Sequence, residues 1–199
     1  MREYEDLVSE IMACTRCRLH LSRRNPVPGE GPVPSEVMIV GEAPGRREDE
    51  AGRPFVGQAG KLLDRLLGLA GLSRSMVYIT NVVKCRPPGN RDPRRDEVEA
   101  CNIYLRRQIR IVSPRIIVTL GRIAGETLYS MAGLRWRGIR AERGRPVNAV
   151  IEGLQVILYP TFHPAAALYN REVLPMLEED FRNLARATSR RGRSLLDFM

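Results

Sequence analysis

Four short apolar runs, alternating with stretches whose apolar residues have helical spacing, constrain the fold of this chain more than any other feature. The runs occupy residues 37–40, 77–80, 116–120 and 156–159. Continuous apolar runs of this length are typical of parallel strands that are buried on both faces. Strands that alternate with helices form a parallel sheet with helices on both sides. The pattern therefore predicts an α/β fold, a three-layer αβα sandwich around a central four-stranded parallel sheet.

The helical stretches between the runs have recognisable ends. One helical face is formed by Leu62, Leu63, Leu66, Leu67 and Ala70, and the helix stops at Gly71. Asp92 and Pro93 are typical of a helix start, and the helix that follows turns Cys101 inward.

The chain has 199 residues, a length that fits one domain with a substantial core. Residues 133–150 show no clear pattern and are predicted to be irregular. We predict a single domain over residues 1–187, followed by a basic tail over residues 188–199.

The chain is strongly basic, and almost all of its basic residues are arginines. Lysine and arginine total 32 against 23 acidic residues, which gives a net charge of +9, and only Lys61 and Lys84 are lysines. Arginine binds phosphate bidentately and stacks on bases, so this composition favours a nucleic-acid partner. Surface ion pairs that support stability at high temperature are the alternative explanation.

Membrane and secreted classes are disfavoured. No apolar run approaches the roughly 20 residues that cross a bilayer, and the acidic residues 3–6 do not resemble a secretory signal. The sequence predicts a soluble, cytoplasmic protein that does not bind a membrane.

The chain has four cysteines, Cys14, Cys17, Cys85 and Cys101. The lack of a secretory signal argues against disulfides, and the close spacing of Cys14 and Cys17 is typical of two ligands for one metal centre. Four thiolates suit either tetrahedral zinc or a [4Fe-4S] cluster, and the spacing does not choose between them. Four unrelated buried thiols are the ordinary alternative.

Unusual residues follow three of the predicted strands. Residues 41–45 and Glu48 follow the first strand, Asn81 ends the second, and His163 follows the fourth. Ligands of open α/β sheets bind beyond the carboxyl ends of the strands, so these residues and Phe55 should line one pocket. Each residue alone has an ordinary explanation in a turn or in the core. Their convergence on one sheet edge favours a functional site.

Six segments and the pair of cysteines at 14 and 17 resemble the family 4 uracil-DNA glycosylases, iron–sulfur enzymes of thermophilic bacteria and archaea. The segments are GEAPG at 41–45, EDEAGRPFVGQAGKLLDRLL at 48–67, YITNVVKCRPPGNRDP at 78–93, EVEAC at 97–101, TLGRIA at 119–124 and PTFHPAAAL at 160–168. The resemblance covers most of the chain and implies the uracil-DNA glycosylase fold. It also implies that the four cysteines bind a [4Fe-4S] cluster, which makes zinc the weaker hypothesis.

The resemblance implies a monofunctional enzyme that flips uracil out of double- or single-stranded DNA and hydrolyses its N-glycosidic bond. The product would be an abasic site for base-excision repair. Phe55 would stack on the flipped base, and Asn81 would recognise its Watson–Crick edge and reject cytosine. His163 would donate a hydrogen bond to O2 as negative charge develops on the leaving uracil.

The segment after the first strand departs from the better-known family 1 enzymes, which have an aspartate at Ala43 and a tyrosine at Gly45. Glu42 is therefore the first candidate to position the nucleophilic water, and Glu48 is the candidate that excludes the 5-methyl group of thymine. The backbone of Glu42 and Ala43 would contact the base, and Gly41 would permit its close approach.

Further expectations concern DNA contacts. Leu168 lies where related enzymes insert a wedge into the base stack, although a leucine that packs in the core is the alternative.

The [4Fe-4S] cluster that the resemblance implies would tie the N-terminal helix to the loop of residues 85–101. Residues 192–199 resemble a sliding-clamp binding box without its leading glutamine, so the tail is a candidate partner site.

Two other functions remain open at this point. One is a broader deaminated-base glycosylase, against which Asn81 argues by favouring uracil. The other is a non-catalytic iron–sulfur module that binds nucleic acid, in which Phe55, Asn81 and His163 would share no purpose. We expect a monomer in a prokaryotic cytoplasm, associated with the nucleoid.

Overall fold

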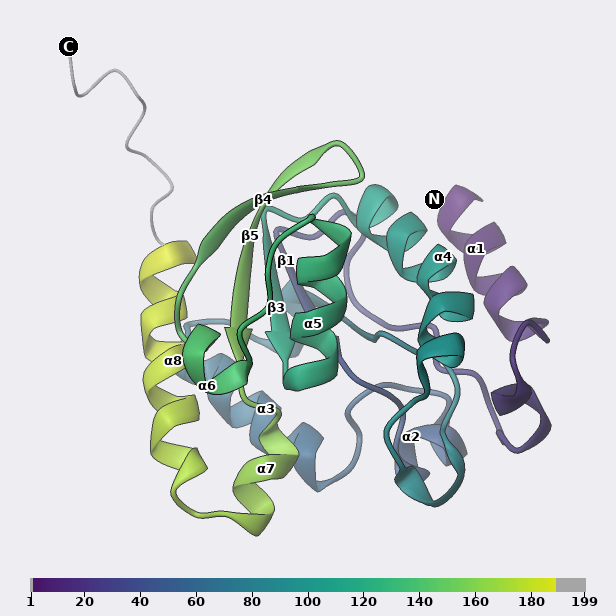
Figure 1. Ribbon diagram of the computed structural model, residues 1–199, viewed down its shortest axis with the longest axis horizontal. Coiled ribbons are helices and arrows are strands. Elements are labelled where there is room, and N and C mark those ends of the chain that lie inside the picture. Colours follow the sequence, from purple (N-terminus) through teal and green to yellow (C-terminus); the bar gives the residue numbers. More distant parts are fainter. Residues whose placement is uncertain (1, 189–199) are drawn as a thin grey trace.

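The computed structural model describes residues 2–188, in which helices alternate with the strands of one sheet (Figure 1). The candidate clamp-binding residues 192–199 lie outside this range. The elements are α1 (Arg2–Met12), β1 (Val37–Gly41), α2 (Arg46–Ala51), α3 (Gln58–Leu69), β2 (Val77–Asn81), α4 (Arg95–Val112), β3 (Ile116–Leu120), α5 (Arg122–Met131), α6 (Ile139–Glu142), β4 (Val147–Ile151), β5 (Leu154–Thr161), α7 (Pro164–Tyr169), α8 (Val173–Thr188) and three short 3-10 helices, Arg18–Leu21, Arg74–Met76 and Pro88–Asn90.

The sheet contains the four predicted strands in parallel and a fifth strand that the sequence analysis missed. The strand order is β2-β1-β3-β5-β4, and β4 runs antiparallel to β5. The prediction of four strands was therefore wrong by one, and residues 133–150 are not wholly irregular. Strand β4 lies at the edge with alternate residues exposed, so it lacks the continuous apolar run that marks a strand buried on both faces.

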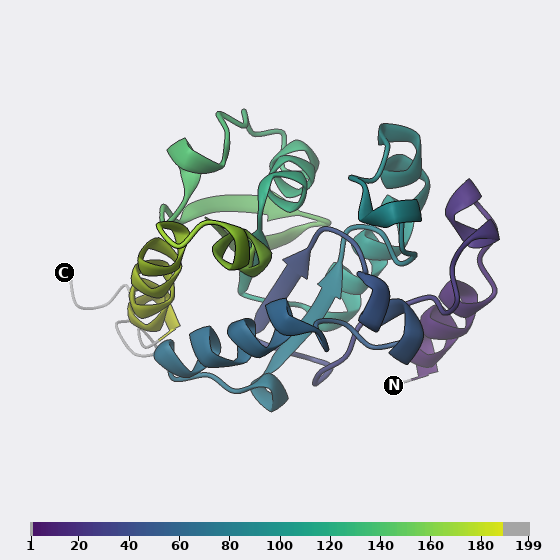
Figure 2. The same cartoon turned by 90° about the horizontal axis from the view of Figure 1, so that it is seen from below.

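The parallel strands separate two apolar cores, as their alternating side chains require. Met38 and Val40 of β1 pack toward α1, α4 and α5, whereas Val37 and Ile39 pack toward α3 and α8. Figure 2 shows α3 and α8 on one side of the strands and α4 and α5 on the other. The predicted three-layer αβα sandwich is confirmed.

Helix α4 begins later than predicted. The sequence places its start at Asp92 and Pro93, but the helix begins at Arg95 with Arg94 as its N-cap. The Glu97 carboxylate accepts the Arg94 N–H at 2.7 Å and so caps the helix in place of Asp92. Asp92 instead pairs with Arg122 at 2.6 Å, which links the loop before α4 to the start of α5.

Many of the arginines pair with carboxylates. Within residues 2–188, thirteen arginines lie within 4.0 Å of an aspartate or glutamate oxygen. Ion pairing therefore accounts for many of the arginines, but not for the net charge of +9, which remains after every acidic residue is counted. No helix among the described residues is both long enough and apolar enough to cross a membrane.

Candidate active site

A cleft of about 410 Å³ lies at the carboxyl edge of the sheet. The register of β1 with β2 places Gly41 directly beside Asn81, so both strands end at this edge. The cleft brings together side chains from the ends of β1, β2 and β5 and from the loop between α2 and α3. It is lined by six of the predicted pocket residues, Glu42, Ala43, Glu48, Phe55, Asn81 and His163.

Asn81 presents an unsatisfied acceptor to this cleft. Its side chain is 1% exposed, and its Oδ1 has no hydrogen-bond partner among the described residues. A buried carbonyl oxygen without a partner is costly unless a ligand satisfies it. Gly41 leaves the necessary room, because a Cβ atom there would lie 2.3 Å from Oδ1 and 2.7 Å from the Cζ atom of Phe55. The strand ends thus hold a carboxamide ready for a polar ligand.

His163 is a neutral hydrogen-bond donor. It caps α7, and its Nδ1 accepts the backbone N–H of Ala165 at 3.1 Å. Burial lowers the pKa of His163 to about 4, although the nearby Glu48 carboxylate opposes this effect. The ring is therefore uncharged at neutral pH, and because Nδ1 accepts, the proton resides on Nε2. The imidazole can donate one hydrogen bond and cannot act as a cationic acid near pH 7.

Phe55 is held in an unusual backbone conformation beside this imidazole. Its φ is 51°, a region that residues other than glycine rarely adopt. The rings of Phe55 and His163 have centroids 5.5 Å apart and an interplanar angle of 26°. The guanidinium of Arg74 donates to the carbonyls of Pro54 and Phe55, which anchors the loop from the side of β2. The strain is thus opposed by fixed contacts, as is common at binding sites.

Glu48 anchors the same loop from α2. Its Oε1 accepts the N–H groups of Val56 and Gly57 at 2.9 and 2.8 Å. Its Oε2 lies near Gly45, where a Cβ atom would approach within 2.8 Å. Glu48 therefore lines the cleft and also fixes the segment that follows Phe55, a structural function that the sequence analysis did not anticipate.

Glu42 has the electrostatics of a group that changes charge near neutral pH. Burial raises the pKa of Glu42 to about 7, the Asp92 carboxylate adds to this effect, and Arg122 opposes it. Its own backbone carbonyl accepts the N–H of Val83 at 3.1 Å, which holds the turn after β1 against the loop after β2. A carboxyl group in this state can serve as a base above neutral pH.

The rim of the cleft includes an aromatic side chain that the sequence analysis missed. Leu168 is 50% exposed and does not line the cleft, whereas Tyr169 is 91% exposed and does. Successive residues of a helix point about 100° apart, so one of the pair faces the cleft and the other does not. Ala165 lines the cleft four residues before Tyr169, as helical spacing requires.

Two other contributors were missed because their contacts are distant in sequence. Arg74 supports Phe55 from 19 residues away. Gly60 permits the start of α3 to approach Phe55, since a Cβ atom there would lie 1.8 Å from its carbonyl oxygen. The short segment around Arg74 carries no motif, so only the fold could identify it.

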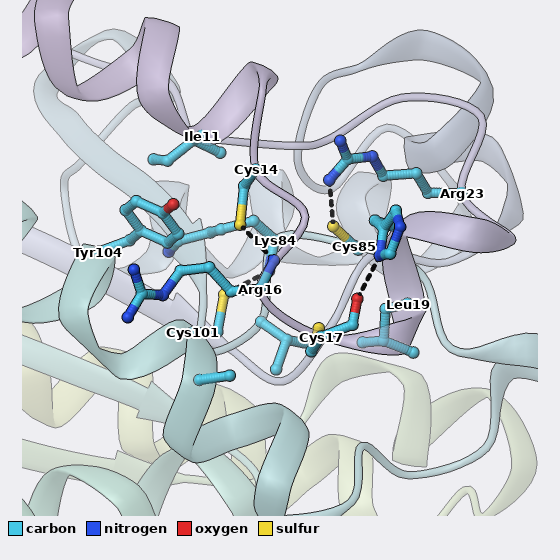
Figure 3. A pocket seen from close by; sticks show the side chains of 13 residues that line it. Ile11, Cys14, Arg16, Cys17, Leu19, Arg23, Lys84, Cys85, Cys101 and Tyr104 are labelled. Carbon is cyan, nitrogen blue, oxygen red and sulfur yellow. Dashed lines mark hydrogen bonds between the residues drawn. The ribbon is translucent and has the colours of Figure 1, made fainter.

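A second pocket is lined by all four cysteines (Figure 3). Cys14 and Cys17 follow α1, Cys85 lies after β2, and Cys101 lies on α4. No three of the described histidine, cysteine, aspartate and glutamate side chains converge closely enough to hold a single metal ion. The four thiols therefore surround one space without meeting at one point.

The sulfur atoms receive N–H donors. The Arg23 guanidinium donates to Cys85 Sγ at 3.1 Å, the Lys84 backbone N–H to Cys101 Sγ at 3.3 Å, and the Arg16 backbone N–H to Cys14 Sγ at 3.5 Å. Burial raises the pKa of Cys101 to about 11, and it also raises those of Cys17 and Cys85. Such thiols remain protonated at neutral pH unless a bound cation replaces their protons.

Comparison with known proteins identifies relatives over the whole chain. Residues 28–187 match the model of the uracil DNA glycosylase superfamily. The chain is 47% identical to the type-4 uracil-DNA glycosylase of Sulfurisphaera tokodaii, over all of this chain and 90% of that protein. It is 43% identical to the type-4 enzyme of Archaeoglobus fulgidus over both full lengths. It is 33% identical to a type-5 uracil-DNA glycosylase of Pyrobaculum aerophilum, over 81% and 82% of the two chains.

Proposed function

The chain belongs to the uracil-DNA glycosylase superfamily, and from this we propose how its cleft recognises uracil and releases it from DNA. The protein is a uracil-DNA glycosylase, a hydrolase that acts on N-glycosidic bonds in DNA. It is monofunctional and leaves an abasic site for base-excision repair. The observation that carries the proposal is the unpartnered Oδ1 of Asn81 in a cleft that also contains a neutral imidazole.

Uracil is recognised by hydrogen-bond complementarity to Asn81. The target base leaves the duplex and enters the cleft, where Oδ1 accepts from N3–H and Nδ2 donates to O4. Cytosine presents an acceptor at N3 and an amino donor at C4, so its binding leaves polar groups unpaired. The ring of Phe55 supports the flipped base by stacking, and Gly41 gives the base access to the carboxamide.

Bond cleavage develops negative charge on the departing uracil, and His163 stabilises it. The Nε2–H donor is held in position by the bond between Ala165 N–H and Nδ1. A preorganised donor of this kind stabilises the transition state more than the ground state. The sugar becomes an oxocarbenium ion that water captures, and Glu42 orients that water.

The role of Glu42 predicts that cleavage depends on pH. Only its carboxylate accepts a proton from water, so with a pKa of about 7 the single-turnover rate rises about tenfold from pH 6 to pH 8. Glu42→Gln should cleave more slowly at pH 8 and lose this rise. Glu50→Gln on α2, where Glu50 is paired with Arg46, should keep it. An unchanged pH profile in Glu42→Gln would remove Glu42 from the proposed mechanism.

Glu48 excludes thymine by occupying space beside the base, where a 5-methyl group would fall. The free Oε2 near Gly45 supports this assignment. Glu48→Ala should therefore allow some cleavage of T:G, although it also removes the anchor of the Phe55 loop. Glu48→Gln keeps both the volume and an oxygen that accepts the two N–H groups, so it is the control that should still exclude thymine.

Cys14, Cys17, Cys85 and Cys101 bind a [4Fe-4S] cluster. The donor set fits, because four thiols line one pocket and N–H groups donate to three of the sulfurs. Tetrahedral zinc would need four sulfurs at about 2.3 Å from one atom, whereas a cluster binds each thiolate through a different iron. The cluster fastens the segment after α1 to β2 and α4.

The metal assignment predicts a visible property. Protein purified without added metal should be brown, should absorb near 400 nm, and should contain about four irons per chain. Cys101→Ala should lose most of the iron and the colour, because it removes one of the four proposed ligands, the buried thiol on α4. A colourless protein that contains stoichiometric zinc would overturn the assignment.

The remaining features concern DNA and the cell. Leu168, which is 50% exposed, enters the base stack as a wedge, and its neighbour Tyr169 lies on the rim of the cleft. Arginines of the surrounding loops hold phosphates. The protein acts as a monomer on the DNA of a prokaryotic nucleoid, and its tail binds a sliding clamp. The many arginine ion pairs support a thermophilic source.

A panel of labelled duplexes tests the activity and its breadth. We expect cleavage of U:G and U:A and of single-stranded uracil DNA, but not of T:G or I:T. Cleavage of I:T at a comparable rate would favour the broader type-5-like alternative. Binding of DNA with no abasic product from any uracil substrate would favour a non-catalytic module instead.

A further inference from the structure

Lys84 is a buried cation without a carboxylate partner. It is 1% exposed, and its ammonium donates to Thr80 Oγ1 at 2.8 Å and to the Asn81 backbone carbonyl at 2.5 Å. No described aspartate or glutamate lies within ion-pair distance of it. A buried charge is normally paired because its desolvation is expensive. The position of Lys84 therefore needs an explanation that the cleft alone does not provide.

The groups around this ammonium that can become negative are the cysteine thiols, because Lys84 lines the same pocket as Cys85 and Cys101. Lys84 lines the cysteine pocket, precedes Cys85 in the chain, and donates its backbone N–H to Cys101 Sγ (Figure 3). When the four thiols bind iron as thiolates, negative charge replaces neutral S–H groups beside the ammonium. The thiolates of Cys85 and Cys101 would then supply the counter-charge that no carboxylate provides.

The other side of Lys84 touches the element that recognises the base. The carbonyl that it binds belongs to Asn81, whose side chain faces the cleft. Thr80, its second acceptor, donates its own hydroxyl proton to the Pro28 carbonyl at 2.7 Å, which fixes the end of β2 to the loop before β1. A displacement of the ammonium would therefore move the backbone that carries the carboxamide.

We propose that Lys84 is a positioning residue through which the cysteine centre holds Asn81 in its uracil-binding orientation. The proposal rests on the proposed function, since it assumes an iron centre and a uracil cleft. It gives a cofactor that takes no part in the hydrolysis a route by which it would act on the cleft. The link is short, because one side chain contacts the base-recognising residue while its own backbone contacts a ligand sulfur.

A pair of variants of the full-length, iron-loaded chain separates this coupling from a general effect on the cluster. Arg23 is the matched control, because its guanidinium also donates to a cysteine sulfur but makes no contact with Asn81. Lys84→Met and Arg23→Gln should both lose iron to a chelator several-fold faster than wild type. Only Lys84→Met should lower the single-turnover rate on U:G, by at least tenfold.

The affinity for duplex lacking uracil distinguishes positioning from loosening of the whole protein. In Lys84→Met this Kd should stay within about twofold of wild type while the cleavage rate falls. A rate within twofold of wild type, or an equal fall in Arg23→Gln, overturns the proposal. A parallel loss of affinity for undamaged duplex also overturns it, since that indicates a structural role.

A milder variant covers the case in which Lys84→Met does not fold or bind iron. Thr80→Val removes one acceptor of the ammonium at nearly constant volume, so it should keep its iron and cleave several-fold more slowly. An unchanged rate in Thr80→Val contradicts the proposal. Failure of the proposed function is distinguishable, because the wild-type protein itself would then be colourless or inactive on uracil.

Discussion

Replacing Asn81 by aspartate should lower kcat/KM for uracil in a U:G duplex by about a thousandfold or more. The aspartate keeps an acceptor for N3–H but loses the donor for O4, so a lone pair of the carboxylate faces a lone pair of the base. The residue is 1% exposed, and a carboxylate at that depth is also destabilised by desolvation. Both effects reduce the fraction of productive complexes.

The measurement is single-turnover cleavage of U:G and C:G duplexes by each variant over a range of enzyme concentrations, whose subsaturating part gives kcat/KM. Because the aspartate can accept the cytosine amino group, a weak activity toward cytosine should appear. Asn90→Asp is the matched control, since Asn90 also lines the cleft but is exposed and bonded to Arg86. Its activity should remain within a few-fold of wild type. Uracil cleavage by Asn81→Asp within tenfold of wild type would falsify the recognition scheme.

Replacing His163 by alanine should lower the cleavage rate by about 100- to 1,000-fold. The substitution removes the donor that faces the developing charge on uracil, while the cleft still binds the base through Asn81 and Phe55. The loss should therefore fall on the rate constant more than on the affinity. His163→Gln, which retains an N–H donor, should recover part of the rate.

The neutral state of His163 leads to a second, independent prediction about how the cleavage rate depends on pH. With a pKa of about 4, the imidazole does not titrate between pH 6 and pH 9, so His163 does not contribute to the rise from pH 6 to pH 8 that is expected from Glu42. His163→Ala should accordingly keep the same rising profile at a lower rate. His20→Ala, with iron content measured alongside, is the control, because His20 lies at the cysteine pocket and not at the cleft. A profile that flattens in His163→Ala would show that the imidazole titrates during catalysis.

The candidate site was predictable where its residues stand at the ends of regular strands. Gly41, Asn81 and His163 each follow an apolar run, and the parallel sheet brings such positions to one edge. The missed features have a common cause. Strand β4 is half-exposed at the sheet edge, and the start of α4 depends on Glu97 and on the pairing of Asp92 with Arg122. Neither is visible in local apolar spacing.

The sequence by itself determined the layers, the sheet edge that carries the cleft, and the residue types that meet there, because periodicity and strand ends are local properties. Only the tertiary structure decided the state of those residues. The tautomer of His163, the raised pKa of Glu42 and the support of Phe55 by Arg74 depend on burial and on contacts across the fold. The same reason applies to Lys84. The sequence shows that this residue is a lysine, but only the folded chain places it between Cys101 and Asn81, away from any carboxylate partner among the described residues.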